Sequence, residues 1–331
     1  MADGKVLAIE RGGQLVFVDT FSATETLYPD VVSFENYHWS PDGLFLSINT
    51  KSSGAISISD LLGNAVIEKP TEYCPSTLQC RDVGKASWSP DGALVAIGGR
   101  EQNIWDVASG EEVRVLPEEG LPIWSPDGTK LGLRANNSKI LDATTGAVHQ
   151  TIEDHIFHSW SPDGRNFATT RSSDIWIWDS QTGEEVTVLV DQAPDVHRNI
   201  AWNPTSDCLV TQNYRDGSVS LWGGPSFSKM ASLGSFEDPG IMAWDPSGRL
   251  LVMAYFEELG ASRIGQGELL SGVLVWDNEV MGEVARYTDP NFRRLWSGGA
   301  HWHPDGSMFA LEVPHDETIW IVPIAGLSIG S

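Results

Sequence analysis

The chain has 331 residues, of which 41% are hydrophobic and 20% charged, a balance that excludes wholesale disorder. Its formal net charge of −24 repels phosphates and anionic lipids, so we expect neither nucleic acid nor a membrane as partner. The N-terminal sequence MADGKVLAIERGG has no long apolar run, which predicts no signal peptide and a cytoplasmic protein.

The cysteines are Cys74, Cys80 and Cys208, too few for a disulfide framework. We expect free thiols, although Cys74 and Cys80 lie close enough in sequence to pair. Spaced zinc ligands are missing, so the sequence predicts neither a metal site nor a cofactor.

The first predicted elements are three short strands, at residues 5–9, 14–18 and 24–28. After them a motif recurs to the end of the chain: Trp, a polar residue and Pro, followed in most copies by Asp-Gly. Its seven copies begin at Trp39, Trp88, Trp124, Trp160, Trp202, Trp244 and Trp302.

The chemistry of the motif predicts a tight turn after a short strand. Pro fixes φ, Asp bonds to the nearby backbone and Gly accepts a positive φ. An apolar strand follows each turn, and a third strand often ends in an aromatic residue and Asp, as at Trp105-Asp106 and Trp178-Asp179. A fourth short strand completes a unit whose two apolar faces need neighbours on both sides.

These Ser-Pro-Asp-Gly turns and Trp-Asp strand ends resemble those of the WD40-repeat family. The resemblance implies an all-β fold, a single β-propeller of four-stranded blades spanning residues 1–331. Seven motifs favour seven blades, with an N-terminal strand closing the ring against the last blade; eight blades are the alternative. The Gly-His dipeptide typical of the family is absent, so we expect its Asp-His-Ser/Thr-Trp hydrogen-bond network to be missing.

Three insertions fall between predicted strands, at residues 70–83, 256–271 and 288–296. Such loops are expected on one face of a repeat protein, where function concentrates. The 256–271 segment would be a lid over an enzyme pocket or an arm that contacts a partner. The loop aromatic residues that we expect to contact a partner are Tyr73, Phe236, Phe292 and Trp296.

A basic residue follows the second strand of nearly every unit, which is unexpected in so acidic a chain. A propeller would gather these side chains around one channel mouth, where they suit a carboxylate or phosphate. The alternative is pairing with neighbouring acidic residues, as in Arg100-Glu101. The series is Arg11, Lys51, Arg100, Arg134, Arg171, Arg215, Arg263 and His315.

Histidines near the motif have two interpretations. His38, His158 and His301 fit strand packing, or an acid–base or metal pair, and His155 lies beside Asp154 without a third spaced ligand.

The sequence holds no recognisable catalytic motif. We therefore predict a monomeric binding protein that recognises a protein or peptide partner, or an anionic ligand, at the basic mouth. An enzyme acting on a small anionic substrate in a pocket there is the alternative.

Overall fold

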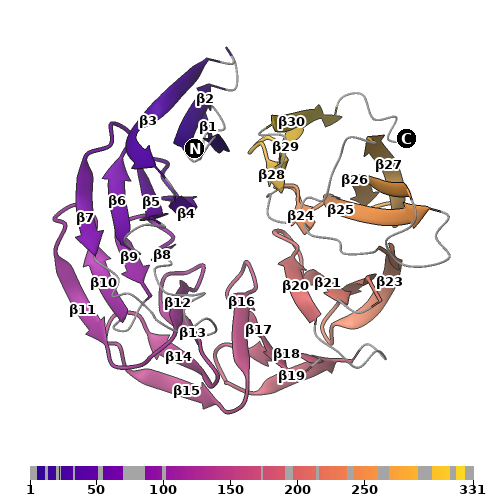
Figure 1. Ribbon diagram of the computed structural model, residues 1–331. Coiled ribbons are helices and arrows are strands. Elements are labelled where there is room, and N and C mark those ends of the chain that lie inside the picture. The colour runs from indigo at the N-terminus through magenta and orange to yellow at the C-terminus, as the bar shows by residue number, and fades with distance from the viewer. Residues whose placement is uncertain are drawn as a thin grey trace. The chain divides into compact units, whose positions relative to one another are not determined.

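The computed structural model describes residues 6–11, 14–19, 22, 24–32, 34–50, 55–69, 86–98, 102–172, 174–190, 197–213, 216–236, 242–259, 268–289, 300–313 and 318–324. These residues form thirty strands, β1 to β30, without an α-helix (Figure 1). The strands pair in chain order into eight sheets, six with four strands and two with three. In this part of the chain no helix is long and apolar enough to cross a membrane.

The chain divides into two compact units, and the first holds Met1–Thr169 and Asp179–Gly183. Sheets 1 to 4 lie in this unit, and sheet 5 contains its boundary. Sheet 1 is β1 (Val6–Arg11), β2 (Gln14–Asp19) and β3 (Glu25–Val32). Sheet 2 is β4 (Phe34–Trp39), β5 (Phe45–Thr50), β6 (Ile56–Asp60) and β7 (Ala65–Lys69). Sheet 3 is β8 (Ala86–Trp88), β9 (Leu94–Ile97), β10 (Gln102–Asp106) and β11 (Glu112–Leu116). Sheet 4 is β12 (Leu121–Trp124), β13 (Lys130–Arg134), β14 (Ser138–Asp142) and β15 (Val148–Ile152). Sheet 5 is β16 (Ile156–Trp160), β17 (Asn166–Arg171), β18 (Asp174–Asp179) and β19 (Glu185–Leu189).

The second unit holds Thr170–Trp178 and Glu184–Ser331. Sheet 6 is β20 (His197–Trp202), β21 (Cys208–Asn213), β22 (Ser218–Gly223) and β23 (Ser228–Ser235). Sheet 7 is β24 (Met242–Trp244), β25 (Leu250–Leu259), β26 (Glu268–Asp277) and β27 (Gly282–Asp289). Sheet 8 is β28 (Ala300–Trp302), β29 (Met308–Val313) and β30 (Thr318–Pro323).

The number of sheets bears on the choice between seven and eight units. The three strands predicted at residues 5–9, 14–18 and 24–28 pair with one another and form sheet 1. The eight sheets of the described residues match the eight-unit alternative rather than the preferred seven. The motif count missed sheet 1 because no Trp-Pro motif precedes it. Closure of a ring by an N-terminal strand stays a prediction.

The Ser-Pro-Asp-Gly turns join the first and second strands of sheets 2 to 5. In sheet 2 the Ser40 hydroxyl donates to Asp42 at 2.6 Å and accepts the Phe45 N–H at 2.9 Å. Gly43 has a φ of 71°, in the left-handed region that glycine adopts without strain. The turns that begin at Ser89, Ser125 and Ser161 repeat the bond from serine to aspartate. The predicted turn chemistry is therefore confirmed.

The third strands end at a second kind of aspartate turn. Hydrogen bonds from the backbone and hydroxyl of Ser109 hold the pKa of Asp106 below its ordinary value. In sheet 4, hydrogen bonds from the backbone and hydroxyl of Thr145 lower the pKa of Asp142 in the same way. Asp19 makes the same bonds with Ser22 after β2, so β2 is the counterpart of a third strand and β1 of a second.

Three of the motif tryptophans, Trp160, Trp244 and Trp302, connect consecutive sheets. Trp160 and Trp244 are buried, and each indole N–H crosses to the sheet before its own. The acceptor is the carbonyl of the residue that precedes the motif Trp in that sheet. The three bonds run from Trp160 to Ile123 at 3.0 Å, from Trp244 to Ala201 at 3.1 Å and from Trp302 to Ala243 at 3.0 Å.

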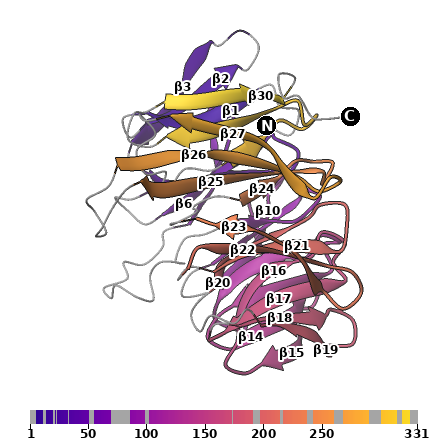
Figure 2. The same ribbon diagram turned by 90° about the vertical axis from the view of Figure 1, so that its right-hand side faces the viewer.

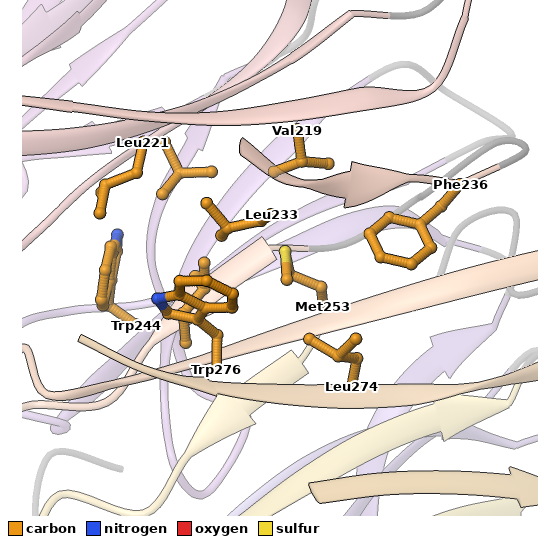
Figure 3. Close-up of a cluster of buried hydrophobic side chains, with 10 residues drawn as sticks. Val219, Leu221, Leu233, Phe236, Trp244, Met253, Leu274 and Trp276 are labelled. Carbon is orange, nitrogen blue, oxygen red and sulfur yellow. The ribbon is translucent and has the colours of Figure 1, made fainter. Parts of the chain in front are cut away.

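Apolar side chains fill the space between neighbouring sheets. Figure 3 shows Val219, Leu221 and Leu233 of sheet 6 facing Met253 and Leu274 of sheet 7, all in one buried cluster. Such packing hides a face of each sheet from water, which a lone four-stranded sheet cannot do. The prediction that each unit buries its apolar face against a neighbouring unit is confirmed for sheets 6 and 7.

Candidate functional site

The predicted basic residues end strands where the structure describes them. Arg134 is the last residue of β13 and Arg171 the last of β17, and both side chains are exposed. The backbone of Arg11 ends β1, but its side chain lies outside the described residues. The other members of the series also lie outside them: Lys51, Arg100, Arg215, Arg263 and His315.

Arg134 differs from most described cations of this chain. Its side chain makes no hydrogen bond or ion pair with any residue that the structure describes, and it stands at the open end of the β12–β13 pair. Arg165 reaches Asp163 at 3.5 Å, Arg286 reaches Glu283 at 2.9 Å and Lys139 pairs with Glu118. Pairing with a neighbouring carboxylate therefore does not explain Arg134.

The prediction for Phe236 is wrong. Its ring is buried in the cluster of sheets 6 and 7, and its backbone N–H donates to the Gly217 carbonyl at 3.0 Å. Gly234, with a φ of 127°, leaves the space that the ring occupies. Phe236 therefore cannot be a surface contact residue. The other loop aromatics, Tyr73, Phe292 and Trp296, lie outside the described residues.

The insertion at 256–271 is strand at both of its ends, residues 256–259 and 268–271. β25 and β26 pair over ten residues each, from Leu250–Asp277 to Leu259–Glu268, and Figure 2 shows them side by side. β24 pairs only with Leu251 to Met253, and β27 pairs with β26 only as far as Ser271. Beyond the Phe256–Ser271 pair the described hairpin is therefore a two-stranded ribbon. Aromatic residues such as Tyr255 and Phe256 favour strands, which explains the difference from the predicted loop. Residues 70–83, 260–267 and 290–296 lie outside the described residues.

An open groove of about 460 Å³ lies on sheets 1 and 2. Its apolar part includes Phe17 and Trp39, whose ring centroids are 5.5 Å apart, and its polar part includes the Asp19 carboxylate. The groove was not predicted from the sequence. The signal that could have indicated it is the absence of a Trp-Pro motif before the strand at residues 5–9, since Trp39 then follows no earlier motif strand.

No family model matches the chain, and no curated protein matches it. Solved structures do match in fold. The C-terminal WD40 domain of Sif2 matches with a TM-score of 0.72 at 14% identity, over 98% of this chain and 93% of that one. A chain of the mitotic checkpoint complex matches with a TM-score of 0.59 at 16% identity, over 96% and 84%. Dihydro-heme d1 dehydrogenase NirN in complex with DHE matches with 0.63 at 16% identity, over 87% and 64%.

This chain has the fold of a WD40 β-propeller. The predicted resemblance is thereby confirmed at the level of fold. The matches include both a protein of a multiprotein complex and an enzyme. The fold by itself therefore does not choose between the two predicted functions.

The hydrogen-bond network expected to be missing from this propeller is present in part. In sheet 6 the Trp222 indole N–H donates to the Thr211 hydroxyl at 2.8 Å, and both residues are buried. The buried His155 places its Nδ1 2.9 Å from the Thr169 hydroxyl. These two bonds lie in different sheets, and the buried indole N–H groups of Trp105 and Trp276, at the position equivalent to Trp222, have no partner in the described residues. The absence of the complete network therefore stays a prediction.

The other histidines that the sequence singled out, His38, His158 and His301, are not brought together by any printed contact of the described residues. His158 Nδ1 lies 3.1 Å from the Ser159 hydroxyl, while His38 and His301 are exposed. Among the described residues no three His, Cys, Asp or Glu side chains could hold one metal ion. Cys208, half-buried, is a free thiol. The sheet 1–2 groove is open and includes one carboxylate, Asp19, among its lining residues.

Proposed function

We propose that this chain is a partner-binding propeller, in which basic side chains at the ends of the second strands contact an acidic segment of a protein partner. The observation that carries the proposal is Arg134, an exposed guanidinium that makes no ion pair with a described residue of a chain with net charge −24. A guanidinium offers a planar fork of donors that matches a carboxylate. Arg171 ends the equivalent strand of sheet 5.

The protein complex among the matching structures supports a protein partner, since a WD40-like chain occurs there within an assembly. The proposal takes residues 1–331 as one domain that acts as a monomer. Binding should weaken as salt rises, because exposed charges are screened.

The test uses a fluorescein-labelled dodecapeptide of alternating glutamate and serine, followed by fluorescence anisotropy at moderate salt. We expect Arg134→Ala combined with Arg171→Ala to weaken binding by about tenfold or more, a typical cost for lost interfacial charges. Arg165→Ala is the matched control, since Arg165 lies just before β17, at the other end from Arg171. Displacement of the peptide by inorganic phosphate would assign the site to a small anion. Equal binding by the wild type and the double variant would refute the proposal.

A further inference from the structure

The groove on sheets 1 and 2 lies at the opposite end of the strands from the basic residues. Val6, which lines it, begins β1, whereas Arg11 ends that strand. The remaining lining residues come from β2, the connection from β2 to β3, β3, β4 and the turn after β6: Phe17, Asp19, Ser22, Thr24, Thr26, Trp39 and Leu61. The groove and the basic ends can therefore be tested independently.

β1, which lines the groove through Val6, is an edge strand of sheet 1 among the described residues. β2 is followed by the aspartate turn that elsewhere follows third strands, so β1 and β2 are the second and third strands of sheet 1. The described residues of sheet 1 include no first strand beside β1. In sheets 5, 7 and 8 the motif Trp donates its indole N–H to a backbone carbonyl in the first strand of the preceding sheet.

Trp39 is the motif Trp of sheet 2, so its equivalent acceptor would be a carbonyl of a strand beside β1. It is half-buried, and its indole N–H has no hydrogen-bond partner in the described part of the chain. Trp88 and Trp124 also lack a partner, but their N–H groups are buried, whereas Trp39 lines an open groove. An extended segment lying in the groove can supply the carbonyl that Trp39 lacks.

The lining chemistry defines the side chains of such a segment. Val6, Phe17 and Trp39 offer an apolar surface suited to an aliphatic side chain. Asp19 adds a negative charge, no lining residue is basic, and the chain carries a net charge of −24. A lysine or arginine beside the aliphatic residue is therefore attracted to the groove, and it can also stack on an aromatic face.

We propose that this groove binds an extended segment of a protein partner in which a lysine or arginine adjoins an aliphatic residue. A backbone carbonyl of the segment accepts the Trp39 indole N–H, the aliphatic side chain packs on Phe17 and Val6, and the cation lies near Asp19. This is a second contact surface, which does not depend on Arg134 or on an acidic partner.

The experiment selects peptides from a phage-displayed library of random dodecapeptides on the full chain and measures synthetic copies by fluorescence anisotropy. We expect the selected peptides to contain Lys or Arg next to Val, Leu or Ile. Trp39→Phe keeps an aromatic ring but removes the N–H, and should weaken binding about fivefold, as loss of one hydrogen bond does. Asp19→Asn keeps an oxygen that can accept the hydrogen bonds of the turn, and it should weaken peptide binding by about threefold, as loss of an exposed ion pair does.

Matched variants control for folding. Trp160→Phe removes an equivalent indole N–H, and Asp142→Asn alters an equivalent turn, both within the first unit but away from the groove. We expect both to leave peptide binding unchanged, with melting temperatures recorded for all four variants. Failure to select peptides, acidic consensus peptides, or binding that survives Trp39→Phe and Asp19→Asn would overturn the proposal. Self-association that Trp39→Phe abolishes, measured by sedimentation, would also overturn it, because the occupant would then be a second copy.

Discussion

The Asp245 carboxylate accepts a hydrogen bond from the Ser247 hydroxyl at 2.5 Å across the motif turn of sheet 7. In sheet 2 the same two turn positions hold Ser40 and Asp42, and the hydroxyl and carboxylate have exchanged places. The residue at the first position accepts the backbone N–H five residues later in both turns. A hydroxyl and a carboxylate can therefore bridge these two positions in either order.

This exchange predicts a compensating pair of substitutions. Asp245→Ser should lower the free energy of unfolding by about 1–3 kcal/mol, because the Leu250 N–H and the Ser247 hydroxyl lose a charged acceptor. Ser247→Asp should also destabilise, since it places two carboxylates in one turn. The double variant recreates the order of sheet 2 and should recover most of the loss in urea denaturation. Losses that simply add in the double variant would contradict the pairing.

The sequence predicted those features that are set by local chemistry. The Pro-Asp-Gly turns and the aspartates such as Asp106 that end third strands follow from residue type alone. Long-range features were predicted less well. Phe236 follows a strand and resembles a loop residue, and only the space left at Gly234 and the facing sheet 7 determine its burial. The groove at Trp39 depends on which strand lies beside β1, which no local pattern contains.

The pair of Arg249 and Asp277 predicts sensitivity to acid. The Asp277 side chain is fully buried, and Arg249 Nη2 lies 2.8 Å from Oδ2. Burial alone would raise the pKa of Asp277, but hydrogen bonds from Arg249 and from the Glu279 and Val280 backbone outweigh it and lower the pKa. The ionised carboxylate therefore stabilises the fold above the ordinary aspartate pKa of about 3.9, and this contribution is lost as the pH falls through the lower folded value.

We expect Arg249→Leu to cost about 3 kcal/mol at neutral pH, because it leaves a buried carboxylate without its cation. Asp277→Asn should instead flatten the dependence of unfolding free energy on pH between about 5 and 2. Guanidinium denaturation at a series of pH values measures both. An unchanged slope in Asp277→Asn would show that other carboxylates control acid unfolding.

Gly132 in β13 is required by the ring of Phe157 in β16. A Cβ at this position would overlap the ring, and both residues are buried. Gly132→Ala should destabilise by about 1–3 kcal/mol through overpacking. Phe157→Leu is itself destabilising, but it should make Gly132→Ala cost much less stability, because the ring that the added methyl meets is gone. The stability losses of the two substitutions should therefore be non-additive in a double-mutant cycle measured by thermal unfolding. Equal costs of Gly132→Ala in both backgrounds would rule out this contact as the cause.

The Thr211–Trp222 bond predicts a similar asymmetry in sheet 6. Thr211→Val retains the shape of the side chain but leaves the Trp222 N–H without its acceptor. Since a buried, unsatisfied donor costs about 1–3 kcal/mol, we expect a loss of that size in urea denaturation. In a Trp222→Phe background the donor is already gone, and Thr211→Val should then be nearly neutral. A loss of the same size in that background would mean that Thr211 stabilises the sheet through its other contacts, and that this part of the network contributes nothing.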